Sequence, residues 1–299
     1  MTCDTKAKLN GKVVVVTGGS SGMGFAAAKN LANRGARVII ASRNETKLRA
    51  AQHEIIEATG NHNVAYKTVD LGSLQSVRNL ASELNAEDQI NVLINNAGSV
   101  GLPDRLTPDG LNLNMQVNYF GTFLLTFLLL PKLKASAPSR ILNGVGAAMY
   151  FGEVNLDHWN DVGRYDILTG LGSSELAINV FNEELARKLK YDAVTANVYD
   201  PFLVRDTDIL ENLSGIIKKF SVLFISTIGH SREDAGREIA YLAAAPELEG
   251  VSGNLYKFCQ KIKNHYLVND RKLRKRLWEE SKKAVKINKY EDWEAYDSV

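Results

Sequence analysis

The chain has 299 residues, 45% of them hydrophobic, so one large domain with its own core is expected. The formal net charge is +2 and the basic residues are scattered, which excludes a general electrostatic attraction to nucleic acid. The two cysteines, Cys3 and Cys259, and the isolated histidines show no metal-ligand spacing, so we expect no metal and two free thiols in a reducing compartment. The polar N-terminal stretch does not resemble a signal peptide, and we predict a cytoplasmic location.

The first third of the chain alternates apolar strands with helices. Four consecutive valines at 13–16 predict a strand that is buried on both faces and runs into a glycine-rich turn ending at residue 24. A helix is expected over 25–35, ended by Gly35, and another over 73–85, begun by Ser73. The remaining elements of this part are strands over 36–44, 63–72 and 90–98 and a helix over 45–59.

The alternation continues to residue 258. Residues 111–135 are expected to be helical, and their apolar run Tyr119–Pro131 is too short to span a bilayer, so we interpret it as a buried helix. A strand over 139–146, a helix over Ser173–Leu189 and a strand over 193–201 follow. Residues 202–235 look irregular, as a segment covering a substrate would be, before a helix over 236–250 and a strand over 252–258. This order predicts an α/β fold: one doubly wound parallel sheet of the Rossmann type with helices on both faces.

The last part of the chain adds a basic helix over 271–287. We expect a single domain over 1–299, with a core at about 10–260 and a C-terminal basic helical extension over 261–299. Leu273, Leu277, Trp278, Ala284 and Ile287 could form one apolar stripe. A terminal helix docked on the domain is the favoured interpretation, and weak contact with a membrane surface is the alternative.

The turn between the first strand and the first helix has the pattern of a dinucleotide site. Gly18 permits a tight turn, Gly22 lets the backbone approach a pyrophosphate, and Gly24 allows the helix to pack closely on the strand. Ser20, Ser21 and Met23 complete the turn, and the helix N-terminus offers N–H donors to phosphate. A strand before the turn, a helix after it and a second strand–helix unit beyond make a ligand-free glycine turn the weaker interpretation.

The end of the second strand favours NADP(H) over NAD(H). A ribose 2′-hydroxyl calls for an acidic residue there, whereas this strand ends in "IIASRN" without one. Arg43 stands at that edge and can pair with a 2′-phosphate. The alternative is an exposed arginine with no ligand.

These motifs together resemble the short-chain dehydrogenase/reductase family, and within it the retinol-dehydrogenase-like branch. The resemblance covers about residues 10–260 and is carried by "TGGSSGMG", Asp70-Leu71, "NNAG" (Asn95–Gly98), Asn118 in "VNYFGTF", "NEELARKLK" and "VTANVYDP". It implies that Asp70 and Leu71 contact the adenine and that Asn118 holds a catalytic helix and its water. It also implies that cofactor-binding residues include Asn96, Ala97, Gly98 and Pro201, and that chains pair through the helices over 111–135 and Ser173–Leu189.

The family's active-site residues are absent from this sequence. Aligned on "RILN" (140–143), the usual serine pair becomes Val145-Gly146, the catalytic tyrosine becomes Leu171 and its lysine becomes Glu175. None of the eleven tyrosines has a lysine four residues further on. After the sixth strand the family's "PG" reads Pro201-Phe202, and the threonine that follows it is replaced by Asp206, for which Thr207 is a substitute.

These replacements remove the groups that handle a proton during carbonyl reduction. General acid–base catalysis and an oxyanion donor together are worth roughly 5–9 kcal/mol of transition-state stabilisation. An ionised Glu175 could still accept hydrogen bonds from ribose hydroxyls, which makes it a cofactor-binding candidate too. The candidate catalytic residues are Asn118, Tyr165, Asp166 and Glu175. Plain loop residues are the alternative interpretation for these and for other polar groups near the expected cleft: Tyr150, Asp157, His158, Tyr199 and Asp206.

Three hypotheses about function remain open. The leading one is an atypical family member that binds NADP(H) and catalyses an isomerisation, a cyclisation or an unusual redox step on a lipophilic small molecule. The alternative is a pseudoenzyme that binds a ligand or a partner, and the third is a slow residual NADPH-dependent carbonyl reductase. A homo-oligomer is expected in each case.

Overall fold

The computed structural model describes residues 3–205, 207, 211–213 and 215–295. Its centre is an eight-stranded sheet in the order β3-β2-β1-β4-β5-β6-β7-β8. Every neighbouring pair is parallel except β7 and β8, which are antiparallel. The strands are β1 (Val13–Thr17), β2 (Arg37–Ser42), β3 (Val64–Thr68), β4 (Val92–Asn95), β5 (Ser139–Gly144), β6 (Val194–Tyr199), β7 (Leu255–Lys257) and β8 (Gln260–Ile262).

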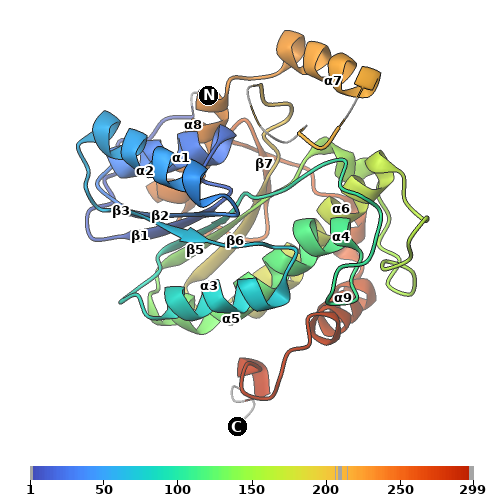
Figure 1. Ribbon diagram of the computed structural model, residues 1–299. Coiled ribbons are helices and arrows are strands. Elements are labelled where there is room, and N and C mark those ends of the chain that lie inside the picture. Colours follow the sequence, from blue (N-terminus) through green and yellow to red (C-terminus); the bar gives the residue numbers. More distant parts are fainter. Residues whose placement is uncertain (1–2, 206, 208–210, 214, 296–299) are drawn as a thin grey trace.

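Helices cover both faces of this sheet (Figure 1). Their apolar residues fall into two clusters, one with α1, α2 and α8 and the other with α3, α5, α6 and α9. The doubly wound Rossmann-type fold expected from the sequence is therefore confirmed. The helices are α1 (Gly22–Asn33), α2 (Glu45–Thr59), α3 (Leu74–Asn85), α4 (Leu113–Met115), α5 (Gly121–Ala135), α6 (Ile167–Lys188), α7 (Gly215–Ile228), α8 (Arg232–Ala244) and α9 (Arg271–Ala284).

Short helical turns join these elements. A π-helical turn connects α4 to α5, and 3₁₀ turns follow β5, α8 and β8 and lie near the C-terminus. They are η1 (Gln116–Phe120), η2 (Ala147–Phe151), η4 (Pro246–Leu248), η5 (Tyr266–Asn269) and η6 (Trp293–Ala295).

The long apolar helix predicted over 111–135 lies inside the protein. Leu113–Ala135 is long and apolar enough to cross a membrane, but 83% of its most apolar window is buried within the domain. Phe123 and Phe127 pack against the rings of Phe181 and Trp278. The expectation of a buried core helix is therefore confirmed.

Two predicted segments differ from the structure. Residues 202–235 are not irregular throughout, because Gly215–Ile228 forms α7. Its sequence is apolar over most of its length. The second difference is the antiparallel edge strand β8, which is only three residues long and leaves little pattern in the sequence.

The basic C-terminal helix is docked on the domain. Leu277 and Trp278 of α9 are buried, and the Trp278 ring stacks on Phe181 at 5.7 Å. Leu273, Ala284 and Ile287 pack against the same cluster, so the predicted apolar stripe is covered by the chain itself. Because α9 also covers part of α6, burial gives no support to pairing through that helix, and the homo-oligomer remains a prediction.

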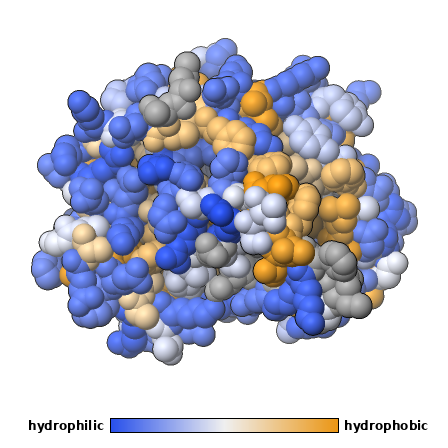
Figure 2. Space-filling model, turned by 90° about the horizontal axis from the view of Figure 1, so that it is seen from above, coloured by the Kyte–Doolittle hydropathy of each residue, from blue (hydrophilic) through white to orange (hydrophobic). Residues whose placement is uncertain are grey.

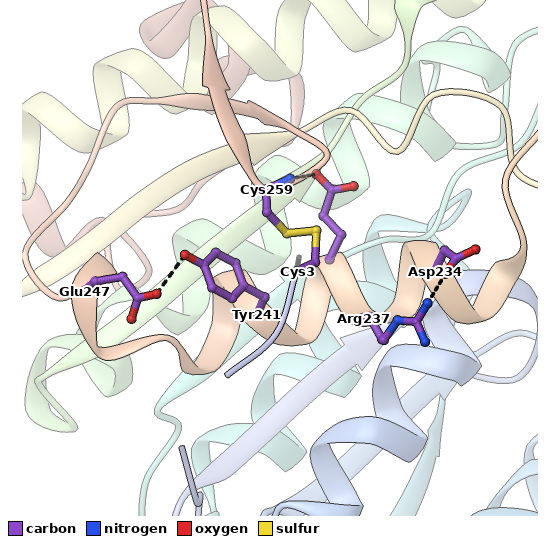
Figure 3. The surroundings of a disulfide bond; sticks show 7 residues. Cys3, Asp234, Arg237, Tyr241, Glu247 and Cys259 are labelled. Carbon is purple, nitrogen blue, oxygen red and sulfur yellow. Dashed lines mark hydrogen bonds and ion pairs between the residues drawn. A yellow bond between two sulfur atoms is a disulfide. The ribbon is translucent and has the colours of Figure 1, made fainter. Parts of the chain in front are cut away.

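The two cysteines are joined, which corrects the expectation of free thiols. Cys3 and Cys259 form a disulfide with a Cα–Cα distance of 5.6 Å, although 256 positions separate them (Figure 3). The N-terminal segment passes beside α8 and so meets the turn between β7 and β8, a proximity that spacing along the chain cannot reveal. Disulfides are uncommon in the cytosol, so the two cysteines no longer favour a location in a reducing compartment. The predicted cytoplasmic location stays untested.

Candidate active site

One cavity of about 1060 Å³ lies along the carboxyl ends of the strands, from β3 to β6. Ligands of open α/β sheets bind at this edge, where the strand order reverses between β1 and β4. The described residues that line the cavity include every predicted cofactor residue: Gly18, Ser20, Ser21, Gly22, Met23, Gly24, Arg43, Asp70, Leu71, Asn96, Ala97, Gly98, Glu175 and Pro201.

The glycine-rich turn is built as the sequence predicts. Gly18 and Gly22 have φ angles of 68° and 57°, in the left-handed region that favours glycine. A Cβ on Gly24 would overlap the backbone oxygen of Gly18, so only glycine allows the helix to lie this close. Ser21 begins α1 without a side-chain hydrogen bond to the first turn, which leaves those N–H groups available to a phosphate. The residues present therefore fit the pyrophosphate of a dinucleotide.

Two basic side chains stand at the end of β2. Arg43 lines the cavity and forms an ion pair with Glu211 at 3.3 Å, both side chains being about half exposed. Lys47 lines the same end and was not predicted, although its position four residues after Arg43, at the start of α2, was visible in the sequence. Ser42 and Ser20 form a hydrogen bond of 2.9 Å that connects the strand end to the glycine-rich turn.

Side-chain hydrogen bonds hold the loops that follow β3 and β4. Asp70 accepts a hydrogen bond from the backbone N–H of Gly72 at 2.9 Å. Asn96 donates to the backbone oxygen of Thr17 at 3.0 Å, which ties the loop after β4 to the end of β1. These bonds fix the central part of the cavity, where the adenosine side of a dinucleotide is expected.

Asn118 positions the loop after β4. It lies in the π-helical turn η1, accepts from the Ser99 N–H at 2.8 Å, and donates to the Ser99 backbone oxygen and to Asn114 at 2.9 and 2.8 Å. Both of its N–H donors are therefore used within the protein. It lines the cavity and positions this loop, whereas the catalytic helix and the water that the resemblance implied for it stay predictions.

The replaced positions meet at the other end of the cavity. Val145, Gly146, Leu171 and Glu175 all line it, so the alignment that identified them agrees with their place in the fold. Burial, with a smaller contribution from nearby Asp200, raises the pKa of Glu175 to about 8. The negative charge expected from the sequence is thus largely absent near neutral pH, because the buried carboxyl keeps its proton.

The remaining candidates serve the structure around the cavity instead of lining it. Asp166 is the N-cap of α6, where it accepts from the N–H groups of Leu168 and Thr169, and these bonds lower its pKa. The Tyr165 hydroxyl is buried without a hydrogen-bond partner among the described residues, and its pKa is raised by burial. The other polar groups are distributed as follows: Asp157 pairs with Arg276 of α9, His158 with Asp161, the Tyr150 ring packs beside His265, and Tyr199 donates to Asn96. Asp206 lies outside the described residues.

An apolar wall completes the cavity and was missed from the sequence. Its members come from the loops after β4, β5 and β6 and from two helices, so only the folded chain brings them together. They are Val100, Phe151, Leu168, Ile178, Phe202, Leu203, Val204, Phe224, Ile225 and Ile228. Phe202 replaces the glycine of the family's motif and keeps a left-handed φ of 61°.

The protein belongs to the short-chain dehydrogenase family: the family described as "short chain dehydrogenase" matches residues 12–215. The chain is 38% identical to human retinol dehydrogenase 13 over 292 residues, covering 95% of this chain and 87% of the relative. It is 34% identical to human polyprenol dehydrogenase, covering 90% and 84%. A crystal structure of a putative uncharacterized protein from Mycobacterium paratuberculosis superposes with a TM-score of 0.76 at 28% identity, covering 96% and 97%. The retinol-dehydrogenase-like branch inferred from the motifs is thus confirmed, and with it a family that uses a nicotinamide cofactor.

Proposed function

We propose that this protein binds NADP(H) together with a lipophilic small molecule and transforms that molecule without the family's serine, tyrosine and lysine. The observation that carries this proposal is one continuous cavity, which is lined by the nucleotide residues at one end and by Leu171 and Glu175 at the other. A cofactor in the glycine-rich cradle and a ligand against the apolar wall would meet beside these two residues.

The apolar wall supports a lipophilic ligand. Several of its side chains continue to the mouth of the cavity and remain exposed: Phe151 by 63%, Phe224 by 58%, Leu168 by 49% and Ile228 by 43%. Figure 2, viewed from the α7 side, shows apolar side chains gathered beside an otherwise polar surface. An exposed apolar patch that leads into a cavity is typical of a binding site. The names of the relatives, retinol and polyprenol dehydrogenase, refer to ligands of the same apolar kind.

The choice of NADP(H) rests on charge at the end of β2. Arg43 and Lys47 line the cavity there, and β2 itself ends without the acidic residue that would hold a ribose 2′-hydroxyl. The 2′-phosphate of NADP(H) would displace Glu211 from the Arg43 guanidinium, because a phosphate dianion pairs with arginine more strongly than a carboxylate does.

A titration of intrinsic and cofactor fluorescence tests the proposal. We expect NADPH to bind with a Kd on the order of micromolar and NADH to bind at least tenfold more weakly. Absence of NADPH binding would contradict the proposed function.

The pseudoenzyme hypothesis and the residual-reductase hypothesis are distinguished by whether the cofactor and the added carbonyl compounds change chemically. The purified protein with NADPH is incubated with lipophilic aldehydes, ketones and quinones, and both cofactor oxidation and ligand mass are followed. A pseudoenzyme would leave all of them unchanged. For a residual reductase, the combined changes Leu171→Tyr, Glu175→Lys and Gly146→Ser should increase carbonyl reduction sharply.

A further inference from the structure

The carboxyl of Glu175 has an unusual place at the replaced end of the cavity. A Cβ built on Gly146 would stand 2.9 Å from Glu175 Oε1, so the glycine leaves the room that this carboxyl occupies. The second oxygen, Oε2, is shielded from solvent and has no hydrogen-bond partner among the described residues. A buried polar atom without a partner is uncommon and points to a group that a ligand satisfies.

The surroundings of Glu175 keep its proton in place. Burial is the main cause that raises its pKa to about 8, Asp200 at the end of β6 adds to the rise, and the backbone N–H groups of Gly146 and Met149 oppose it. The turn after β5 contributes no charged side chain. Asp200 is itself paired with Lys257 of β7 at 3.0 Å, which partly neutralises it, and its charge also raises the pKa of Glu238 in α8.

Glu175 is the one acidic side chain at this end of the cavity among the described residues. The other two carboxyls that line the cavity belong to the nucleotide end: Asp70 holds the N–H of Gly72, and Glu211 pairs with Arg43. Leu171, Val145 and Gly146 cannot supply a proton. The unpartnered acid thus lies where the family's tyrosine and lysine are missing.

We propose that Glu175 donates the proton to the oxygen of a lipophilic aldehyde or ketone that is reduced in this cavity. The inference rests on the proposed function and selects, from its open reactions, a redox step with a different proton source. A reduced dinucleotide held by the glycine-rich turn would supply a hydride, that is one hydrogen with two electrons, to the carbonyl carbon. As the C=O double bond becomes single, the oxygen takes the Glu175 proton, which leaves an alcohol and a carboxylate that water reprotonates through the open mouth.

The first experiment compares the wild type with Glu175→Gln, Glu175→Asp and Glu183→Gln. Glu183 is a matched control because it lies on α6, is partly buried with a raised pKa and does not line the cavity. We expect the wild type to reduce at least one carbonyl of a panel containing retinal and long-chain aldehydes and ketones, with kcat falling above about pH 8. Glu175→Gln should lower kcat by about 10²–10⁴-fold and abolish this pH dependence with KM for the carbonyl unchanged, whereas Glu183→Gln should behave as the wild type.

The second experiment observes the proton directly in the cofactor-free protein. Infrared difference spectra should show a protonated carboxylic acid component that titrates near pH 8 in the wild type and in Glu183→Gln but is lost from Glu175→Gln, where only the component of Glu238, whose pKa is raised to about 7, should remain. The inference is overturned if the Glu175 component is missing at neutral pH, if Glu175→Gln keeps the wild-type kcat and pH profile, or if the wild type binds NADPH yet reduces no carbonyl. In the last case the cofactor-binding part of the proposed function stands alone, whereas a wild type that binds no NADPH overturns both.

Discussion

Gly146 and Glu175 are two substitutions that depend on each other. The family's serine at 146 would place its Cβ 2.9 Å from the Glu175 carboxyl, closer than side chains normally approach. In the sequence, the two replacements appear unrelated. The structure shows that the missing side chain at position 146 leaves the space that the Glu175 carboxyl occupies.

Gly146→Ser alone should therefore destabilise the protein by about 1–3 kcal/mol, as expected for an overpacked site. In the Glu175→Ala background the same serine should cost much less, because the carboxyl that it meets is gone. Urea unfolding of the four members of this double-mutant cycle measures the coupling. Additive effects of the two changes would show that the side chains do not compete for space.

Glu175 should also make stability depend on pH. Its pKa is raised from 4.5 to about 8 in the folded protein, so between these values the folded state holds a proton that the unfolded state has lost. Stability therefore falls as pH rises through this window, by on the order of 4 kcal/mol in total. Glu175→Gln should remove that part of the fall, and melting curves at a series of pH values would show it. An unchanged slope in the variant would contradict the raised pKa.

Arg43 should determine the cofactor preference. Arg43→Leu should weaken NADPH binding about tenfold or more and leave NADH binding nearly unchanged, since only NADPH carries the 2′-phosphate. Glu211→Gln serves as a contrasting variant: it removes the carboxylate that pairs with Arg43 and should strengthen NADPH binding. Equal losses for both cofactors in Arg43→Leu would assign the arginine a purely structural role.

The residues proposed to bind the cofactor could be located from the sequence because they follow one another in short motifs at strand ends. Every one of them, from Gly18 to Pro201, lines the cavity. The protonation of Glu175 could not be predicted, since it depends on burial and on Asp200, 25 positions further along the chain. The use of Asp166 as a helix cap was visible in principle, because Asp166 and Thr169 form a capping pattern at the start of α6.

At the scale of elements, α6 begins earlier than its apolar pattern suggested. The helix was expected from Ser173 but starts at Ile167, with Asp166 and Thr169 capping each other's backbone. The first turn is exposed and lacks a continuous apolar face, so periodicity did not reveal it. This added turn carries Leu168, and the next carries Leu171, to the wall of the cavity.

Asp166→Ala tests whether this carboxylate is structural or catalytic. Loss of the cap should lower the Tm by about 2–4 °C and leave turnover and NADPH binding close to the wild type. Asp166→Asn is the matched variant, because asparagine caps helices as well and should retain the wild-type Tm. A large loss of turnover in Asp166→Asn with the Tm intact would restore Asp166 as a catalytic base.

Helix α7 was not predicted from the sequence, and the part of the cavity lining that it supplies was missed with it. It exposes Val222, Leu223 and Phe224 while its residues Phe224, Ile225 and Ile228 line the cavity. The helix is thus apolar both toward the cavity and toward solvent, and its cavity side joins residues that are distant in the sequence. The apolar wall therefore became evident only after folding.

At the scale of the whole molecule, most of the architecture follows from the alternation of strands and helices. The parallel sheet, the helices on both of its faces and the buried helix over 111–135 were predicted, because each depends on local apolar patterns. Contacts between the chain ends and the core were not predictable in this way. The N-terminal segment reaches the β7–β8 turn and α9 covers α6 through side chains that are distant in sequence.

The link between Cys3 and Cys259 should contribute measurably to stability. Because the closed loop spans nearly the whole chain, Cys3→Ser should cost about 2–5 kcal/mol in non-reducing buffer. Addition of a reductant should lower the stability of the wild type to that of the variant and leave the variant unchanged. If the reductant leaves the stability of the wild type unchanged, and mass spectrometry of the intact protein shows two free thiols, the disulfide is not formed.

The disulfide between Cys3 and Cys259 also determines whether a single backbone cleavage separates the chain into two molecules. The segment around α7, with its exposed apolar side chains, lies between Cys3 and Cys259 in the sequence. A protease that cuts there opens the covering segment of the cavity, yet the two pieces remain one covalent molecule. Such a nicked protein would keep the whole nucleotide cradle while gaining a wider entrance for bulky apolar ligands.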